Sequence, residues 1–115
     1  MLTPKIDPSV FVAKGAIVLG DVTIEKDCSI WYNATVRSTE SYIKIGKGSN
    51  VQDNAVIHVS HDYPTTIGSY VTIGHGAIIH GCSIDDNVSI IVCQTIDGKH
   101  KITIDYPFLF ALIPP

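Results

Sequence analysis

An aliphatic residue recurs at every sixth position through most of this chain of 115 residues. The first run of this spacing comprises Ile6, Val12, Val18, Ile24, Ile30 and Val36. After an interruption of three residues it resumes at Ile45, Val51 and Ile57, and after one of four residues at Ile67, Ile73 and Ile79. It then comes one residue early and continues at Ile84 and Ile90. An α-helix does not give this pattern, because six residues advance it by about 600° and bring the side chain to the wrong face.

This spacing predicts an all-β fold, a triangular β-solenoid in which six residues form one flat side and three sides form one coil. The aliphatic residue of each unit would point inward, and successive coils would stack about 4.8 Å apart. Glycines follow the aliphatic positions at Gly20, Gly46, Gly68 and Gly74, where a corner needs either a positive φ or a close approach of two backbones. A β-sandwich is the alternative, but it would need polar turn clusters at intervals of about 8–12 residues.

Composition restricts the class of protein further. The length predicts one domain, and the net charge of -3 gives no basic surface for nucleic acid or an anionic membrane. The N-terminal residues contain no apolar segment of a signal peptide, and no apolar run is long enough to span a bilayer. Three cysteines without a CxxC pair argue against a disulfide framework and predict a cytoplasmic protein in which Cys28, Cys82 and Cys93 are buried.

Two histidines are predicted to lie side by side on the solenoid. Counting six residues per side places Arg37, His58 and His80 on the same side of three successive coils, each just after an inward aliphatic residue. They would form an outward column with one residue per coil. His58 and His80 would then be close enough to share a metal ion.

His75 is predicted to lie on a different side, the one that also carries Gln52. It can join the other two histidines only if that side of a neighbouring subunit packs against them. A prism with three similar sides makes such contacts naturally in a closed C3 homotrimer.

Three neutral imidazoles with an open fourth position are a ligand set of catalytic zinc. The alternative for any one outward histidine is an ordinary solvated or interface side chain. We assign His61 and His100 to the surface in this way, with proton transfer as the alternative role of His61.

The segments VRSTE, SNVQDNAVIH and IGHGAIIHGC resemble those of the γ-class carbonic anhydrases and their bacterial relatives, over about Pro8 to Ile90. The six-residue repeat is similar to that of the hexapeptide-repeat proteins, which implies a left-handed parallel β-helix. The resemblance also implies a homotrimer in which each interfacial metal is bound by His58 and His80 of one subunit and by His75 of the next.

The same resemblance implies an activity and further roles. The protein would be a zinc-dependent carbonate dehydratase, a lyase that hydrates CO2 reversibly to bicarbonate with a metal-bound hydroxide. The cofactor would be Zn²⁺, with iron or cobalt (Fe²⁺ or Co²⁺) in some members. Arg37 would form ion pairs at the subunit interface, Gln52 would bind the metal-bound water, and Glu40 would be the acidic residue near the site.

Two features depart from the family pattern. Thr39 stands where the family has an aspartate that pairs with the arginine, so Arg37 would need Glu40 or Asp53 instead. The sequence also divides into a β-helix over residues 1–90 and an atypical C-terminal tail over residues 91–115. In that tail the spacing persists at Ile96, Ile102 and Phe108, which predicts either one degenerate coil or a cap on the end of the solenoid.

Two other functions fit this sequence class. A coenzyme A-dependent acyltransferase of the hexapeptide-repeat type would need only one histidine, as a general base. It would usually also have a long protruding loop, whereas the interruptions STESY and HVSHDYPTT are short. The second alternative is a non-catalytic metal-binding trimer, favoured by the missing aspartate and the atypical tail.

Overall fold

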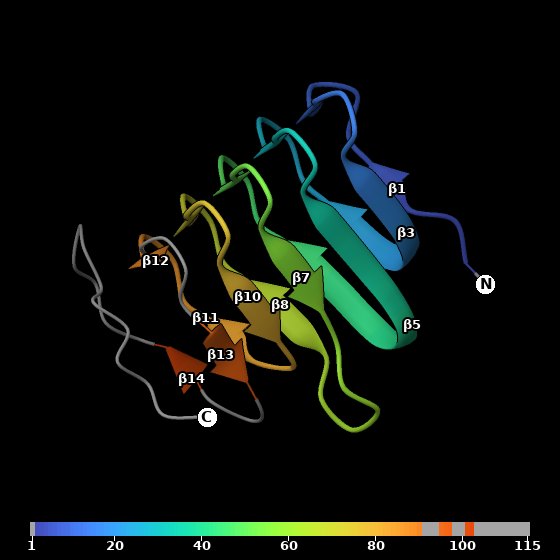
Figure 1. The fold of residues 1–115 in the computed structure, drawn as a ribbon, viewed down its shortest axis with the longest axis vertical. Coiled ribbons are helices and arrows are strands. Elements are labelled where there is room, and N and C mark those ends of the chain that lie inside the picture. The colour runs from blue at the N-terminus through green and yellow to red at the C-terminus, as the bar shows by residue number, and fades with distance from the viewer. Residues whose placement is uncertain (1, 91–94, 98–100, 103–115) are drawn as a thin grey trace.

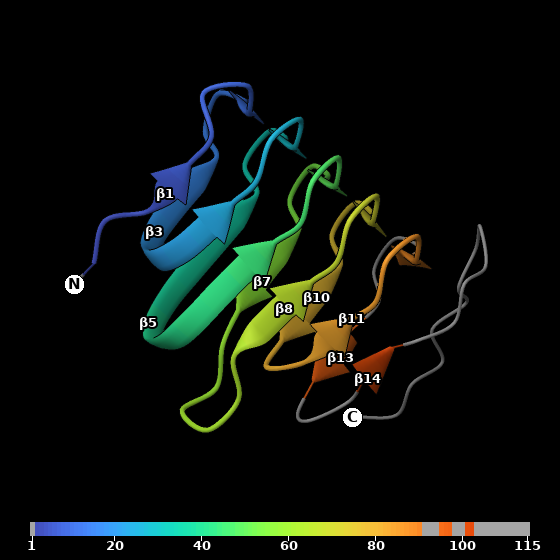
Figure 2. The same cartoon turned by 180° about the vertical axis from the view of Figure 1, so that it is seen from behind.

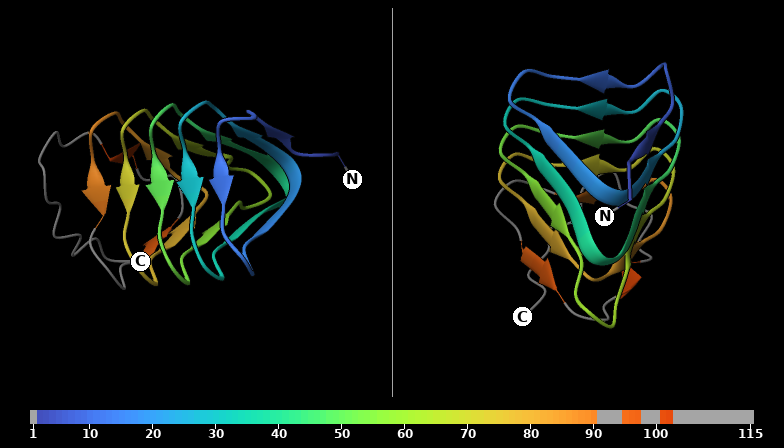
Figure 3. Two further views of the ribbon diagram at one scale, coloured as in Figure 1. Left: turned by 90° about the horizontal axis from the view of Figure 1, so that it is seen from above. Right: turned by 90° about the vertical axis from the view of Figure 1, so that its right-hand side faces the viewer.

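The computed structural model describes residues 2–90, 95–97 and 101–102. These residues form a stack of coils with a triangular outline (Figure 3). Every recorded strand pair is parallel. The strands are β1 (Lys5–Ile6), β2 (Phe11–Val12), β3 (Ile17–Ile24), β4 (Ser29–Ile30), β5 (Thr35–Ile45), β6 (Asn50–Val51), β7 (Val56–His58), β8 (Thr65–Ile67), β9 (Thr72–Ile73), β10 (Ile78–His80), β11 (Ser83–Ile84), β12 (Ser89–Ile90), β13 (Thr95–Asp97) and β14 (Lys101–Ile102).

The prism has three faces. The first face is the five-stranded sheet β12-β9-β6-β4-β2. The nine-stranded sheet forms the other two faces, because β3 and β5 bend around the corner between them as continuous strands (Figures 1 and 3). The second face contains the first halves of β3 and β5 with β7, β10 and β13, and the third face contains their second halves with β1, β8, β11 and β14. The sequence predicted a turn at each corner, whereas β3 and β5 continue through the corner between the second and third faces without one.

The inward aliphatic residues stack in register, as predicted. On the second face Val36 pairs with Ile57, and Ile57 pairs with Ile79. All three are fully buried, because each coil is covered by the coils on both sides. Ile6 and Val12 in the first coil are exposed, since only one neighbouring coil covers them. Burial of these aliphatic side chains is the main source of stability in such a stack.

Three of these four glycines serve the two purposes that the sequence allowed. Gly20 has a φ of 87°, whereas Gly46 and Gly68 allow adjacent coils to approach closely. A Cβ on Gly46 would lie 2.6 Å from the carbonyl carbon and oxygen of Gly68. Other residues with positive φ turn the remaining corners. The corners after the third face contain Asp27, Gly48, Tyr70 and Asn87. The corners after the first face contain Gly15, Asn33, Asn54 and Gly76.

Replacing Gly46 with alanine is expected to destabilise the solenoid. The new methyl group meets backbone atoms that cannot move without displacing the next coil, so we expect a loss of about 1–3 kcal/mol in the free energy of unfolding. Urea denaturation measures this loss. Asp85→Ala, at an exposed position nearby, is the control and should change stability by less than about 0.5 kcal/mol. Equal stability of the two variants would contradict the close approach of the coils.

The spacing continues into the tail as far as the structure describes it. Strand β13 pairs with β10, which places Ile96 opposite Ile79, and β14 pairs with β11, which places Ile102 opposite Ile84 (Figure 2). Phe108 and most of the tail lie outside the described residues. The division into residues 1–90 and 91–115 therefore stays a prediction, as does the proposed cap.

Cys28 and Cys82 are buried, as predicted, and Cys93 lies outside the described residues. In the part of the chain that the structure describes, no helix has the length and apolar character needed to cross a membrane.

Candidate metal centre

His58 and His80 occupy equivalent positions at the ends of β7 and β10 on the second face. The two residues are register partners in adjacent coils. Their ring centroids lie 5.3 Å apart, with an angle of 45° between the ring planes. The predicted side-by-side arrangement is therefore observed, whereas the role of the two imidazoles as metal ligands stays a prediction.

One nitrogen of this pair suits a metal. The His58 Nε2 atom is buried and has no hydrogen-bond partner among the described residues. Burial lowers the pKa of the His58 imidazole, the charge of Arg37 and the neighbouring His80 ring lower it further, and the carboxylate of Glu40 opposes them. A depressed pKa keeps the ring neutral at neutral pH, which is the form that binds a metal. The donor set therefore fits a metal ion.

Arg37 lies in the same column, one coil before His58. It follows Val36, which pairs with Ile57, and its side chain is exposed. Within the described part of the chain the structure records no ion pair for Arg37. Thr39 is exposed two residues further along β5, and strand alternation places it on the same side as Arg37. Because threonine carries no charge, the residue beside Arg37 on this side of β5 gives its guanidinium no carboxylate to pair with.

Glu40 lies close to a histidine that the sequence assigned to the surface. The Glu40 Oε2 atom is 3.9 Å from the His61 Nδ1 atom, and their side chains are 53% and 82% exposed. Glu40 lies in the bend within β5, and His61 lies in the segment after β7. Both segments protrude at the corner between the second and third faces (Figure 1). The charge of Glu40 also acts on His58, so this carboxylate is near the histidine pair as well as near His61.

His75 and Gln52 line a cleft on the first face. The cleft has a volume of about 530 Å³ and is lined by Ser29, Trp31, Tyr32, Asn50, Gln52, Asp53 and His75. The Gln52 Nε2 atom donates a hydrogen bond of 3.1 Å to Asn50 Oδ1, and Asn50 Nδ2 donates one of 3.1 Å to Thr72 Oγ1. These two bonds fix the orientation of the Gln52 amide. Sequence reasoning missed the role of Asn50.

The corner between the first and second faces carries a second column of side chains. His75, Asp53 and Tyr32 occupy this corner in successive coils, because Gly76 N donates to Asp53 O and Asn54 N donates to Tyr32 O, each at 3.0 Å. We call Tyr32, Asp53 and His75 the corner column. Sequence reasoning missed the column as such, although each member precedes an asparagine or glycine with positive φ.

A single chain does not bring the three histidines together. The pair lies on the second face, whereas His75 lies at the edge of the first. Among the described residues, no three histidine, cysteine, aspartate or glutamate side chains are grouped closely enough to hold a metal ion. A set of three imidazoles would therefore need a second copy of the chain.

Curated relatives and solved structures resemble the described part of the chain. A protein from Methanocaldococcus jannaschii named "Probable carbonic anhydrase" is 54% identical over 91 residues, covering 79% of this chain and 57% of that protein. The mitochondrial gamma carbonic anhydrase 2 of Arabidopsis thaliana is 44% identical over 103 residues, covering 84% and 37%. The match thus covers little more than half of the first relative and about a third of the second. No family model matches the chain.

Solved structures agree on the fold. A hexapeptide transferase family protein from Anaplasma phagocytophilum is 38% identical with a TM-score of 0.72, covering 82% of this chain and 58% of that one. A Bacillus cereus protein described as an acetyltransferase is 32% identical with a TM-score of 0.68, covering 82% and 69%. Given these relatives and the triangular coil, the chain belongs to the γ-class carbonic anhydrase-like family of hexapeptide-repeat β-helix proteins.

Proposed function

We propose that this protein is a metal-dependent carbonic anhydrase that works as a homotrimer. Each metal would be held by His58 and His80 of one subunit and by His75 of the next. The substrate pair would be CO2 and bicarbonate. Zn²⁺ is the first candidate for the metal, and Fe²⁺ or Co²⁺ are the alternatives.

The main support is the histidine pair on the second face. The two imidazole ring centroids lie 5.3 Å apart on adjacent coils. The His58 Nε2 atom is buried without a hydrogen-bond partner among the described residues. A third imidazole, His75, lies beside Gln52 on a different face, where only another subunit could bring it to the pair. This division of ligands between two faces is what a shared interfacial site requires.

A metal in such a site supplies Lewis acidity, which lowers the pKa of water to about 7 and makes hydroxide available at neutral pH. Gln52 would orient the reacting water, because its amide nitrogen already donates to Asn50 and its carbonyl oxygen remains available to accept a hydrogen bond from that water. Glu40 would accept the released proton, since its carboxylate is half exposed and near the histidine pair.

Arg37 would stabilise the interface rather than touch the substrate. In the absence of an aspartate at position 39, Glu40 and Asp53 are the candidate partners. Among the described residues Glu40 is recorded with His61 and not with Arg37, which favours Asp53 on the first face of the neighbouring subunit. Asp53 lies one coil from His75 in the corner column, so the same packing that completes the metal site would bring Asp53 toward Arg37. An interfacial ion pair of this kind fixes the register of two surfaces.

Elemental analysis followed by a CO2 hydration assay tests the proposed activity. Purified protein is expected to contain close to one metal ion per subunit, to hydrate CO2, and to lose activity when a chelator removes the metal. His61→Ala is the control for metal held by a surface histidine. It removes an exposed imidazole outside the proposed ligand set and should retain the metal. A metal-free protein that transfers acyl groups from coenzyme A would support the acyltransferase alternative, and a metal-loaded protein without hydration activity would support the non-catalytic trimer.

A further inference from the structure

We propose that aromatic and aliphatic side chains near the N-terminal end of the prism form a second contact between neighbouring copies, which holds the assembly together without metal. The proposal rests on the interfacial arrangement described under the proposed function, and it adds what drives that assembly. The partner is a second copy of this chain, and the contact joins the first face of one copy to the second face of the next.

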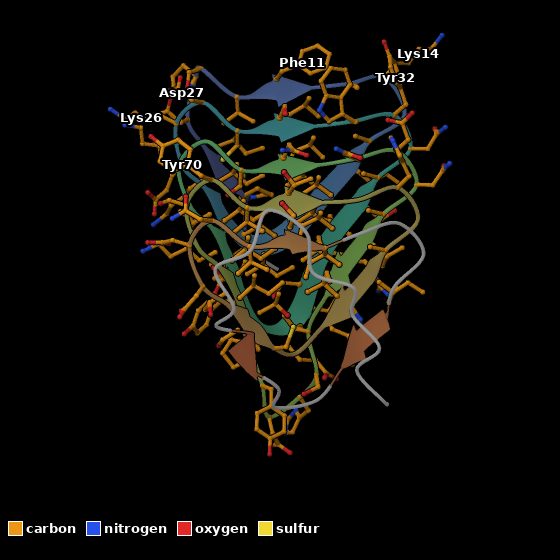
Figure 4. All side chains as sticks on the ribbon, turned by 90° about the vertical axis from the view of Figure 1, so that its left-hand side faces the viewer. Phe11, Lys14, Lys26, Asp27, Tyr32 and Tyr70 are labelled. Carbon is orange, nitrogen blue, oxygen red and sulfur yellow. The ribbon has the colours of Figure 1, made fainter. Side chains whose placement is uncertain are left out.

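Each of the two faces carries an exposed apolar row at the same end. On the first face, Phe11 and Trp31 have ring centroids 5.1 Å apart, and Trp31 and Tyr32 have centroids 6.2 Å apart. On the second face, Ile17 and Leu19 point outward from β3. Phe11, Tyr32, Ile17 and Leu19 are between 39% and 52% exposed. Figure 4 shows Phe11 on the first face and Tyr32 at its edge, beside Lys14. Contiguous exposed apolar groups of this kind mark interaction sites.

The two rows come into contact when the metal site forms. Leu19, Arg37, His58 and His80 succeed one another along the second face, one per coil. The corner column advances by the same step. If His75 of one copy lies between His58 and His80 of the next, Asp53 falls between Arg37 and His58. Tyr32 then falls between Leu19 and Arg37.

The register therefore divides the interface into two zones. The polar zone contains the histidines, Arg37 and Asp53. The apolar zone contains the aromatic row of one copy and the aliphatic row of the next, because Trp31 is in the same coil as Tyr32 and Phe11 is one coil earlier. Aromatic anchors packed on aliphatic side chains supply much of the binding free energy in protein interfaces. The apolar zone needs no metal, so the metal-free protein is expected to remain assembled.

The oligomeric mass of the full chain, measured by light scattering with and without a chelator, tests this proposal. We expect chelated wild-type protein to keep its trimeric mass. Leu19→Asp should dissociate it to monomers, because a carboxylate would be buried against the aromatic row. The matched control is Thr23→Asp, which adds the same charge to the third face in the same strand.

A milder pair of variants covers the case in which Leu19→Asp does not fold. Tyr32→Ala is expected to raise the dissociation constant of the assembly at least tenfold, whereas Tyr70→Ala should leave it unchanged. Both tyrosines are about half exposed, and they lie at opposite edges of the first face (Figure 4). A chelated wild-type protein that is monomeric, or a Tyr32→Ala protein that assembles like wild type, would overturn the proposal. A trimer that never contains metal would instead contradict the proposed function and leave the apolar contact standing.

Discussion

Homotrimers of His58→Ala and of His75→Ala are each expected to purify without bound metal, and a mixture refolded together should regain about one quarter of the sites. The reason is that, in the proposed site, His58 and His80 come from one subunit and His75 comes from the next. In a random mixture, a site is complete where a His75→Ala subunit supplies the pair and a His58→Ala subunit supplies the third imidazole. Elemental analysis of the refolded protein measures the recovery.

A mixture of His58→Ala with His80→Ala is the matched control for this experiment. These two histidines are register partners in one chain, so no arrangement of the two variants gives a complete site. The control mixture should therefore stay without metal. If the His58→Ala and His75→Ala mixture recovers no more metal than the control, the division of ligands between two subunits is wrong.

The parts of the fold that repeat could be predicted from the sequence. A spacing of six fixes which side chains point inward, and stacking then fixes which residues are neighbours one coil apart. This is why the sequence predicted that His58 and His80 lie side by side, although they are separated by an interrupted repeat. The inward stack of Val36, Ile57 and Ile79 was predicted for the same reason.

The irregular parts could not be predicted in the same way. The repeat does not show that β3 and β5 continue around a corner. The spacing from Val18 to Ile24 in β3 is regular, and the interruption at residues 38–41 in β5 looks like any other loop in sequence. The approach of His61 to Glu40 depends on the conformations of two protruding segments, which follow no period. The corner column was within reach, because the dipeptides at Tyr32–Asn33, Asp53–Asn54 and His75–Gly76 all signal a turn. Its proposed role depends on a second subunit, whose contacts do not follow from the spacing within one chain.

Reversing the charge of Arg37 or of Asp53 is expected to dissociate the proposed trimer, and reversing both should restore it. The column of the second face offers Arg37 no carboxylate, since Thr39 stands two residues along, whereas the corner column carries Asp53 at the height that the metal site would impose. Arg37→Asp or Asp53→Arg alone would place two like charges together in a partly buried contact. Such a change costs about 2 kcal/mol or more, which raises the dissociation constant by about 30-fold or more.

The Lys44–Glu25 pair on the third face provides the comparison for this charge reversal. Its Nζ and Oε1 atoms are 3.4 Å apart, and both side chains are well exposed. Reversing one of these charges should leave the oligomeric mass unchanged, because an exposed pair contributes at most about 1 kcal/mol and takes no part in the proposed interface. Light scattering on the single and double charge reversals of both pairs therefore separates a specific contact from a general effect of charge. If Arg37→Asp/Asp53→Arg is as dissociated as either single variant, Arg37 has another partner and the register of the two columns is wrong. If only the double variant assembles, the lost family aspartate has been replaced across the subunit boundary.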